Sequence, residues 1–218
     1  MRPVYLLDIE GTTTPISFVY QVLFPFARAQ FGTFLQENWD KPAVRAEAAG
    51  LGEAIESPEQ AEKAALALMD EDRKLGPLKA LQGRIWEAGY RSGHLKSQLF
   101  PDVPPMLRRR KTAGLRSYIY SSGSVLAQRL LFSHTHEGDL TNLLAGYFDT
   151  EVGSKGESDS YRKIAEQIGI SPSDGLFATD VLAEALAARE AGWQSVLMVR
   201  PGNPAQAPND FEVWTEFN

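Results

Sequence analysis

The chain has 218 residues, of which 43% are hydrophobic and 23% charged, the composition of an ordinary folded protein near the upper edge of one typical domain. Disordered, collagen-like and low-complexity proteins are excluded. Because 28 Asp and Glu outnumber 22 Lys and Arg, the net charge is -6 and the protein repels polyanions, so we expect no nucleic-acid partner. The absence of cysteine excludes disulfide bonds and thiolate metal sites.

The N-terminal segment MRPVYLLDIEG carries only a short apolar run before Asp8. Such a run is too short for the apolar part of a signal peptide, and a membrane-spanning helix needs about 20 apolar residues. We therefore expect a cytoplasmic protein that has no membrane partner.

Short apolar runs at four places predict strands that are buried on both faces of a parallel sheet. These runs are Val4–Leu7, Leu115–Tyr120, Gly175–Thr179 and Ser195–Val199. Helical patterns separate them: Tyr161, Ile164, Ala165 and Ile168 recur at helical spacing, and Gly169 is placed to end that helix. This alternation predicts an α/β fold with a doubly wound parallel sheet and helices on both faces.

The alternation stops between about Ser17 and Leu99, where only helical patterns occur. They cover Phe18–Trp39, Glu59–Leu75 and Leu78–Tyr90. The sequence Ser57-Pro58-Glu59-Gln60 is typical of a helix start, with Pro at the first position and Gln at the third. We therefore expect an α/β core of residues 1–16 and 100–218, with an all-helical cap of residues 17–99 inserted after the first strand.

Polar residues follow the predicted strands at the edge where open α/β sheets bind ligands. They are Asp8, Glu10, Ser121, Ser122 and Asp180, and Lys155 lies in a loop that opens a helix. Carboxylates are oxygen ligands for a hard divalent cation, whereas hydroxyl groups and Lys suit phosphate oxygens. A cluster of carboxylates without a cation would repel itself, so we predict a Mg²⁺ site beside a phosphate site.

Four short motifs in this chain resemble those of the haloacid dehalogenase superfamily, in the same order. They are DIEGT after the first strand, SSG after the second, Lys155 before a helix, and the TD pair that ends at Asp180. The resemblance implies a Rossmann-type core in which Asp8 is a nucleophile and the acid two residues later is the general acid and base. That second acid is usually Asp in the superfamily, and here it is Glu10.

Longer strings resemble the acireductone synthase family, the enolase-phosphatases of methionine salvage. They include DIEGTTTPISFV, YIYSSGSV, GSKGESDSYRKIA, TDVLAEALAA and LMVRPGN. The resemblance covers nearly the whole chain and is weakest through Lys41–Leu75. It implies Mg²⁺-dependent conversion of 2,3-diketo-5-methylthiopentyl 1-phosphate to its enol phosphate, and then to the acireductone 1,2-dihydroxy-3-keto-5-methylthiopentene plus phosphate, through an aspartyl-phosphate intermediate.

The same resemblance implies a role for each matched residue. Asp8, Glu10 and Asp180 carry over as metal-associated residues, and Ser121, Ser122 and Lys155 carry over as contacts to the substrate phosphate. Asp8, Glu10 and Lys155 carry over as the catalytic residues. The expected partner is a small phosphorylated diketone, and we expect a monomer. The sequence does not identify the base that removes the carbon-bound proton during enolisation.

Three other functions stay open at the level of the sequence. A general small-molecule phosphatase of the same superfamily, without enolase activity, would share every core motif. A phospho-accepting receiver domain also has an acceptor Asp on a doubly wound sheet, but the long helical insertion argues against it. A haloacid dehalogenase is disfavoured because Glu10 and a metal site serve phosphate rather than halide.

Two further features have alternative interpretations. Glu184 lies one helical turn after Asp180, and it either reaches the metal through water or is a first-turn acid favoured by the helix dipole. The basic run Arg108–Lys111 could indicate nucleic-acid binding, but on an acidic chain we interpret it as a solvated helix end.

Overall fold

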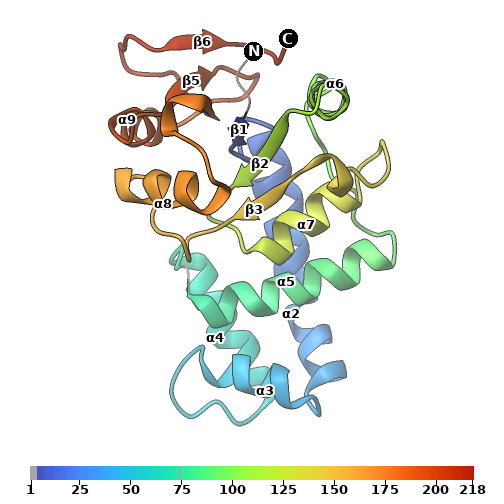
Figure 1. Ribbon diagram of the computed structural model, residues 1–218. Coiled ribbons are helices and arrows are strands. Elements are labelled where there is room, and N and C mark those ends of the chain that lie inside the picture. The colour runs from blue at the N-terminus through green and yellow to red at the C-terminus, as the bar shows by residue number, and fades with distance from the viewer. Residues whose placement is uncertain (1–3, 74) are drawn as a thin grey trace. The chain divides into compact units, whose positions relative to one another are not determined.

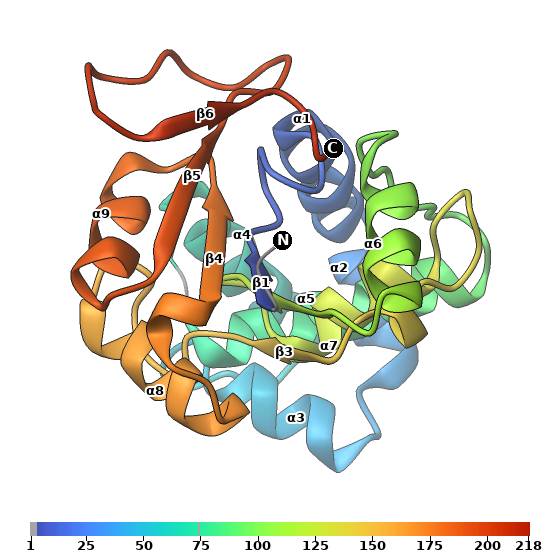
Figure 2. The same cartoon turned by 45° about the horizontal axis from the view of Figure 1, so that its top comes forward.

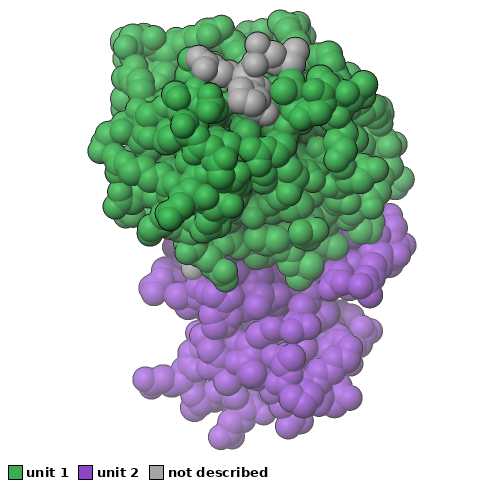
Figure 3. All heavy atoms as spheres, viewed as in Figure 1, with its two compact units in different colours: residues 1–19, 96–218 green, residues 20–95 purple. Residues whose placement is uncertain are grey.

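The computed structural model describes residues 4–73 and 75–218 of the chain. It divides the chain into two compact units, one formed by Met1–Val19 with Lys96–Asn218 and the other by Tyr20–Leu95 (Figure 3). We call them the sheet unit and the helical unit. The helical unit lies within the predicted insertion of residues 17–99, and its role as a cap stays a prediction.

Within the described residues, the sheet unit contains a six-stranded parallel sheet in the order β3-β2-β1-β4-β5-β6 (Figures 1 and 2). The strands are β1 (Val4–Leu7), β2 (Arg116–Tyr120), β3 (Gly146–Phe148), β4 (Gly175–Thr179), β5 (Gln194–Met198) and β6 (Glu212–Trp214). The central strand β1 pairs Leu7 with Ile119 of β2 on one side and with Ala178 of β4 on the other. The doubly wound parallel sheet predicted from the sequence is confirmed, and β3 and β6 are additional strands that the apolar runs did not indicate.

One face of the sheet carries a large apolar cluster. Side chains alternate along a strand, so Leu6, Tyr120 and Phe177 point to the same face and pack against Tyr161 and Ala188. These two residues belong to α8 (Ser158–Ile168) and α9 (Leu182–Glu190). Gly169 ends α8 with a φ of 68°, in the left-handed region, as its position in the sequence predicts.

The opposite face contacts α6 (Val103–Thr112), and here the prediction for the basic run Arg108–Lys111 is partly wrong. Arg110 is buried: its guanidinium lies 3.4 Å from the centre of the Tyr5 ring, and its Nε donates to Ser117 Oγ at 3.0 Å. Tyr5 and Ser117 lie on the face away from α8 and α9, because their neighbours in β1 and β2 point the other way. A cation over an aromatic ring explains why this one Arg packs on the sheet.

The described residues of the sheet unit form four further helical segments. They are α1 (Ile16–Phe18), α7 (Val125–Ser133) and two 3₁₀ turns, Thr141–Leu143 and Pro172–Asp174. Ser124 begins α7, and its Oγ accepts a hydrogen bond from the Ala127 amide.

The helical unit contains α2 (Phe24–Asn38), α3 (Pro42–Ala49), α4 (Pro58–Asp70) and α5 (Gly76–Arg91), and a π-helical turn, Val19–Leu23, leads into it. Its core is formed by Ala27, Phe31, Leu35, Val44, Ala48, Leu51, Ala61, Ala65, Leu78, Leu81 and Ile85. The capping box predicted at Ser57 is confirmed, since the Ser57 hydroxyl accepts from the Gln60 amide and the Gln60 side chain accepts from the Ser57 amide. The sequence did not indicate α3, and the predicted helix Glu59–Leu75 ends earlier, at Asp70; residue 74 lies outside the described residues.

Among residues 4–73 and 75–218, no helix combines the length and the apolar composition needed to cross a membrane.

Candidate active site

The candidate site lies at the carboxyl ends of β1 and β4, where the strand order reverses. From β1 the chain continues to β2 on one side, and after β3 it returns to β4 on the other side of β1. Such a reversal leaves a crevice between the two strands at their carboxyl ends. Asp8 follows β1 and Asp180 follows β4, and the Asp8 amide donates to the Ala178 carbonyl at 3.0 Å. The sheet therefore places two acids side by side at this crevice.

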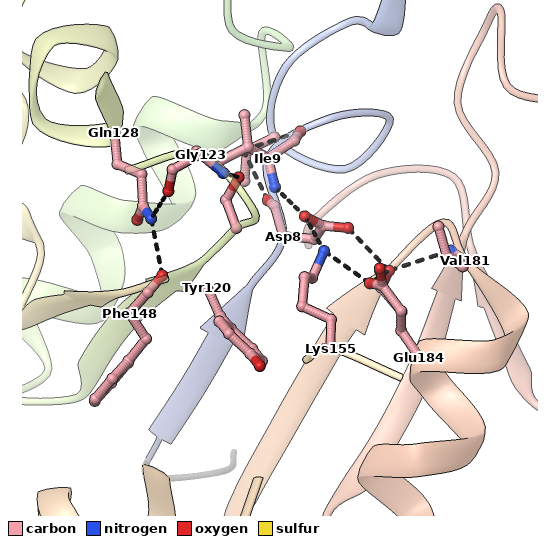
Figure 4. Close-up of polar contacts among 12 residues, drawn as sticks. Asp8, Ile9, Tyr120, Gly123, Gln128, Phe148, Lys155, Val181 and Glu184 are labelled. Atoms are coloured by element: carbon pink, nitrogen blue, oxygen red, sulfur yellow. Dashed lines mark hydrogen bonds and ion pairs between the residues drawn. The ribbon is translucent and has the colours of Figure 1, made fainter. Parts of the chain in front are cut away.

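Asp8 is 2% exposed, and both of its carboxylate oxygens have partners (Figure 4). Oδ1 lies 2.6 Å from Lys155 Nζ and accepts from the Ile9 amide at 2.7 Å. Oδ2 accepts from Thr179 Oγ1 at 3.0 Å. These contacts fix the orientation of the carboxylate and place it beside a cation, an arrangement that suits a nucleophilic carboxylate.

A tight turn follows Asp8 and carries Glu10. The amides of Thr12, Thr13 and Thr14 all donate to the Ile9 carbonyl, and the Gly11 amide donates to the Thr14 carbonyl at 2.8 Å. Gly11 has a φ of 67°, and a Cβ at this position would overlap the Asp180 carboxylate. Only glycine suits both the backbone conformation and the close approach.

Lys155 lies in the loop between β3 and α8, as predicted, but it is buried. Its Nζ lies 2.6 Å from Asp8 Oδ1 and 2.7 Å from Glu184 Oε2. Burial alone would lower the pKa of Lys155, but the negative charges of Asp8 and Glu184 outweigh burial and raise this pKa above its ordinary value. Lys155 therefore remains a cation in the centre of the site.

Side chains from the sheet and from α8 hold the Lys155 loop. Tyr120 donates from its hydroxyl to the Gly153 carbonyl at 2.9 Å, Ser160 Oγ donates to the Ser154 carbonyl at 2.7 Å, and Tyr161 donates from its hydroxyl to the Lys155 carbonyl at 2.7 Å. The buried end of α8 thus fixes the backbone that carries the lysine.

Glu184 belongs to the charged cluster around Lys155. The sequence alone did not decide whether this acid is part of the site. Besides Lys155, its Oε2 accepts from Thr179 Oγ1 at 2.9 Å. Burial, and then repulsion by Asp8, raise the pKa of Glu184 to about 7 although Lys155 opposes this shift. Thr179, which the sequence analysis did not select, contacts both Asp8 and Glu184, and the Val181 amide donates to its Oγ1 at 3.1 Å.

Asp180 is the acid that best indicates a place for a cation. Burial, followed by the charge of Asp8 and to a smaller extent that of Glu10, raise the pKa of Asp180 to about 7. Over the described part of the chain, no group of three or more His, Cys, Asp or Glu side chains is arranged to hold a metal ion. Mg²⁺, however, usually keeps several waters and needs only one or two carboxylates with substrate phosphate, so Asp8 and Asp180 fit it.

The Ser121-Ser122-Gly123 turn lies at the carboxyl end of β2, as the sequence predicts. Ser121 is buried; its amide donates to the Phe148 carbonyl at 3.2 Å, and its Oγ accepts from the Gly123 amide at 3.1 Å. Gln128 of α7, which the sequence analysis missed, donates from Nε2 to the carbonyls of Gly123 and Phe148, both at 2.8 Å (Figure 4). This amide joins the turn to the end of β3, and a lone Gln in a helical pattern gives no sign of such a contact.

Comparison with known proteins adds independent information. Residues 3–192 match the profile of a hydrolase family, the haloacid dehalogenase-like hydrolases. A protein named enolase-phosphatase E1 from Leptospira borgpetersenii is 46% identical over 222 residues, which cover 98% of this chain and 96% of the relative. The enolase-phosphatase E1 of Caenorhabditis elegans is also 46% identical, over 91% of this chain and 87% of the relative.

Solved structures agree with the fold. The crystal structure of the Unknown transcript 4 protein of Saccharomyces cerevisiae is similar at a TM-score of 0.88 and 36% identity, and the similarity covers 100% of this chain and 99% of that one. L-2-haloacid dehalogenase from Xanthobacter autotrophicus, at a TM-score of 0.53 and 18% identity over 91% of this chain and 78% of that one, shares the fold.

Proposed function

The chain belongs to the enolase-phosphatase E1 family of the haloacid dehalogenase-like hydrolases, and we propose that it carries out both the enolase and the phosphatase step of methionine salvage. The substrate is 2,3-diketo-5-methylthiopentyl 1-phosphate, which is enolised and then hydrolysed to the acireductone and phosphate. The observation that carries the proposal is the buried contact of Asp8 with Lys155 at the reversal of the strand order.

In the phosphatase step, a carboxylate oxygen of Asp8 attacks the phosphorus atom, and the bond from phosphorus to the substrate oxygen breaks. The product is an aspartyl phosphate, so one difficult displacement becomes two easier ones. Water then attacks the phosphorus, which releases inorganic phosphate and restores the Asp8 carboxylate. The hydrogen bonds from Ile9 and Thr179 keep this carboxylate in one orientation through both displacements.

Glu10 is proposed as the general acid and base of these displacements. It gives a proton to the departing enol oxygen and then takes a proton from the attacking water. Two observations support this role: Glu10 is two residues after the proposed nucleophile, on the turn held by the Ile9 carbonyl, and its charge contributes to the raised pKa of Asp180.

Lys155, Ser121 and Ser122 are proposed to contact the substrate phosphate. Lys155 Nζ, already 2.6 Å from Asp8 Oδ1, would offset the negative charge of the phosphate as it approaches the carboxylate. Ser121 and Ser122 lie on the turn that Gln128 fixes, and they would donate to the phosphate oxygens.

Mg²⁺ is the proposed cofactor, held by Asp8 and Asp180 with a contribution from Glu10. When bound, it supplies positive charge that reduces the repulsion between anions and polarises the substrate carbonyl for enolisation. The shifted pKa of Asp180 supports this assignment, because a buried carboxyl beside another acid is stabilised as an anion by a cation.

The function is tested with the diketo phosphate itself. Enol formation is followed by its ultraviolet absorbance, and phosphate release is measured separately in the same reaction. We expect both. If phosphate is released only from simple phosphate esters and the diketo phosphate is not enolised, the chain is a general phosphatase of the superfamily, and the proposed function is wrong.

A further inference from the structure

The loop after β5 contains the string RPGN, which is part of the resemblance to the family. None of its side chains belongs to the site described above. We call residues Arg200–Gln206 the RPGN loop. It follows the carboxyl end of β5 (Gln194–Met198), which pairs with β4, so the loop starts at the same edge of the sheet as Asp180.

Three side chains of the RPGN loop donate to backbone carbonyls of the turns that carry the acids. Asn203 Nδ2 donates to the Gly11 carbonyl at 2.9 Å, and Arg200 Nε donates to the Thr12 carbonyl at 3.2 Å. Gln206 Nε2 donates to the Asp180 carbonyl at 2.7 Å. One loop therefore holds both the turn after Asp8 and the residue after β4, which are far apart in the sequence.

The two turns approach each other with no free space at this point. A Cβ on Gly11 would overlap the Asp180 carboxylate and would lie 3.0 Å from Asn203 Oδ1. The Asn203 amide also donates to the Met198 carbonyl at 3.2 Å, so it joins the Gly11 turn to the end of β5. A small shift of either turn would change the spacing between the acids that they carry.

Arg200 anchors the RPGN loop through contacts with residues outside the candidate site. Arg200 is 5% exposed and forms a bidentate pair with Asp102, at 3.0 and 2.8 Å. Its guanidinium also donates to the Thr215 carbonyl at 2.8 Å and lies 4.5 Å from the Phe100 ring centre and 5.2 Å from that of Phe217. A planar guanidinium held by a carboxylate and two rings is a rigid support.

We propose that Asn203 and Gln206 are positioning residues of the phosphatase step, which set the spacing between the Glu10 turn and Asp180 through their hydrogen bonds to Gly11 and Asp180. The proposal rests on the proposed function for its readout. Misplacing reacting groups by about 1 Å lowers rates by up to roughly a hundredfold, so losing these donors should lower kcat rather than weaken binding.

The test uses Asn203→Leu and Gln206→Met, which keep much of the side-chain volume but remove the donors. The matched control is Asn209→Ala, because Asn209 is exposed just beyond the loop and its side chain bonds to near neighbours: it donates to the Ala207 carbonyl at 2.8 Å and accepts from the Phe211 amide at 3.0 Å. For each variant, kcat and KM are measured with p-nitrophenyl phosphate and with the diketo phosphate, together with the melting temperature with and without Mg²⁺.

We expect Asn203→Leu and Gln206→Met to lower kcat about tenfold or more on both substrates, with KM within about twofold, and to weaken the Mg²⁺-induced rise in melting temperature. The control should match the wild type. The proposal is overturned if both variants keep kcat within twofold, or if Asn209→Ala loses as much. Should Asn203→Leu fail to fold, Gln206→Met decides by the same criteria.

These outcomes are distinct from a failure of the proposed function. A wild-type enzyme that hydrolyses p-nitrophenyl phosphate but does not convert the diketo phosphate would refute the enolase-phosphatase assignment. The positioning roles of Asn203 and Gln206 would still be decided by the aryl ester.

Discussion

Thr179 shows how one hydroxyl group can organise two acids. Its Oγ1 accepts from the Val181 amide and lies within hydrogen-bond distance of both Asp8 and Glu184. A hydroxyl has one proton to donate, so at any moment it serves one of the two carboxylates. The amide of Val181 fixes the oxygen, and the two acids compete for the proton.

Replacing Thr179 by Val keeps the branched shape and removes the hydroxyl. We expect Thr179→Val to lower kcat by about tenfold to a hundredfold, because Asp8 loses a partner that fixes its orientation and the Val181 amide loses its acceptor. Thr179→Ser restores the hydroxyl and should recover most of the activity. Steady-state kinetics of both variants check this. A wild-type kcat in Thr179→Val, or a loss in Thr179→Ser as large as that in Thr179→Val, would contradict the role of the hydroxyl group.

Asp180 and Glu184 make the stability of the metal-free protein depend on pH. The pKa values of both are raised to about 7, from 3.8 for Asp and 4.5 for Glu. Between about pH 5 and pH 8 the folded state therefore binds more protons than the unfolded state, and the free energy of unfolding falls as the pH rises.

This pH dependence is measured by urea unfolding with a chelator present. We expect the free energy of unfolding to fall by more than about 1 kcal/mol between pH 5 and pH 8, and the slope to become smaller in Asp180→Asn. Asp174→Asn, which changes an exposed acid near β4, is the control and should keep the wild-type slope. A free energy that stays constant or increases over this range contradicts the shifts.

The secondary-structure elements show which parts of the fold can be predicted from local sequence. Strands β1, β2, β4 and β5 contain apolar runs because most of their side chains are buried in the middle of the sheet. The edge strands β3 (Gly146–Phe148) and β6 (Glu212–Trp214) are short and partly exposed, so no pattern marks them. Helix α3 (Pro42–Ala49) is rich in Ala, and it buries only Val44 and Ala48, which is too few for a recognisable stripe.

The candidate site is predictable only in part for a related reason. Residues that follow buried strands, such as Asp8 and Asp180, can be predicted because the end of each apolar run marks their position. Thr179 and Asp8 are 171 residues apart, and nothing local to either residue indicates their hydrogen bond. The same holds for Asn203 and Gly11, which only the folded sheet brings together.

Two neighbouring arginines of helix α6 test how this helix is held on the sheet, because Arg110 is buried and Arg109 is exposed. Arg110→Ala removes a guanidinium that stacks on Tyr5 and donates to Ser117 and to the Arg116 carbonyl, so we expect a loss of about 2–4 kcal/mol in the free energy of unfolding. Arg109→Ala changes an exposed residue and should cost less than about 0.5 kcal/mol. Chemical denaturation compares them; similar values for both would mean that Arg110 is not held as described.

At the scale of the whole molecule, the proposed function requires that one site and one metal serve both reactions. Asp8 and Asp180 follow neighbouring strands at one edge of the sheet, and the pKa shifts of Asp180 and Glu184 both include the charge of Asp8. Removing Mg²⁺ with a chelator should therefore stop enol formation and phosphate release together, and adding it back should restore both. A chelated enzyme that still enolises at the normal rate would contradict a shared metal.

Chemical trapping shows directly whether an aspartyl phosphate forms at Asp8. The enzyme is mixed with substrate and Mg²⁺, quenched during turnover and treated with borohydride, which reduces an acyl phosphate to an alcohol and leaves free carboxylates unchanged. Peptide mass spectrometry should then find homoserine at position 8, and none without substrate. Reduction at another acid, or an unchanged Asp8 while phosphate is being released, would contradict Asp8 as the nucleophile.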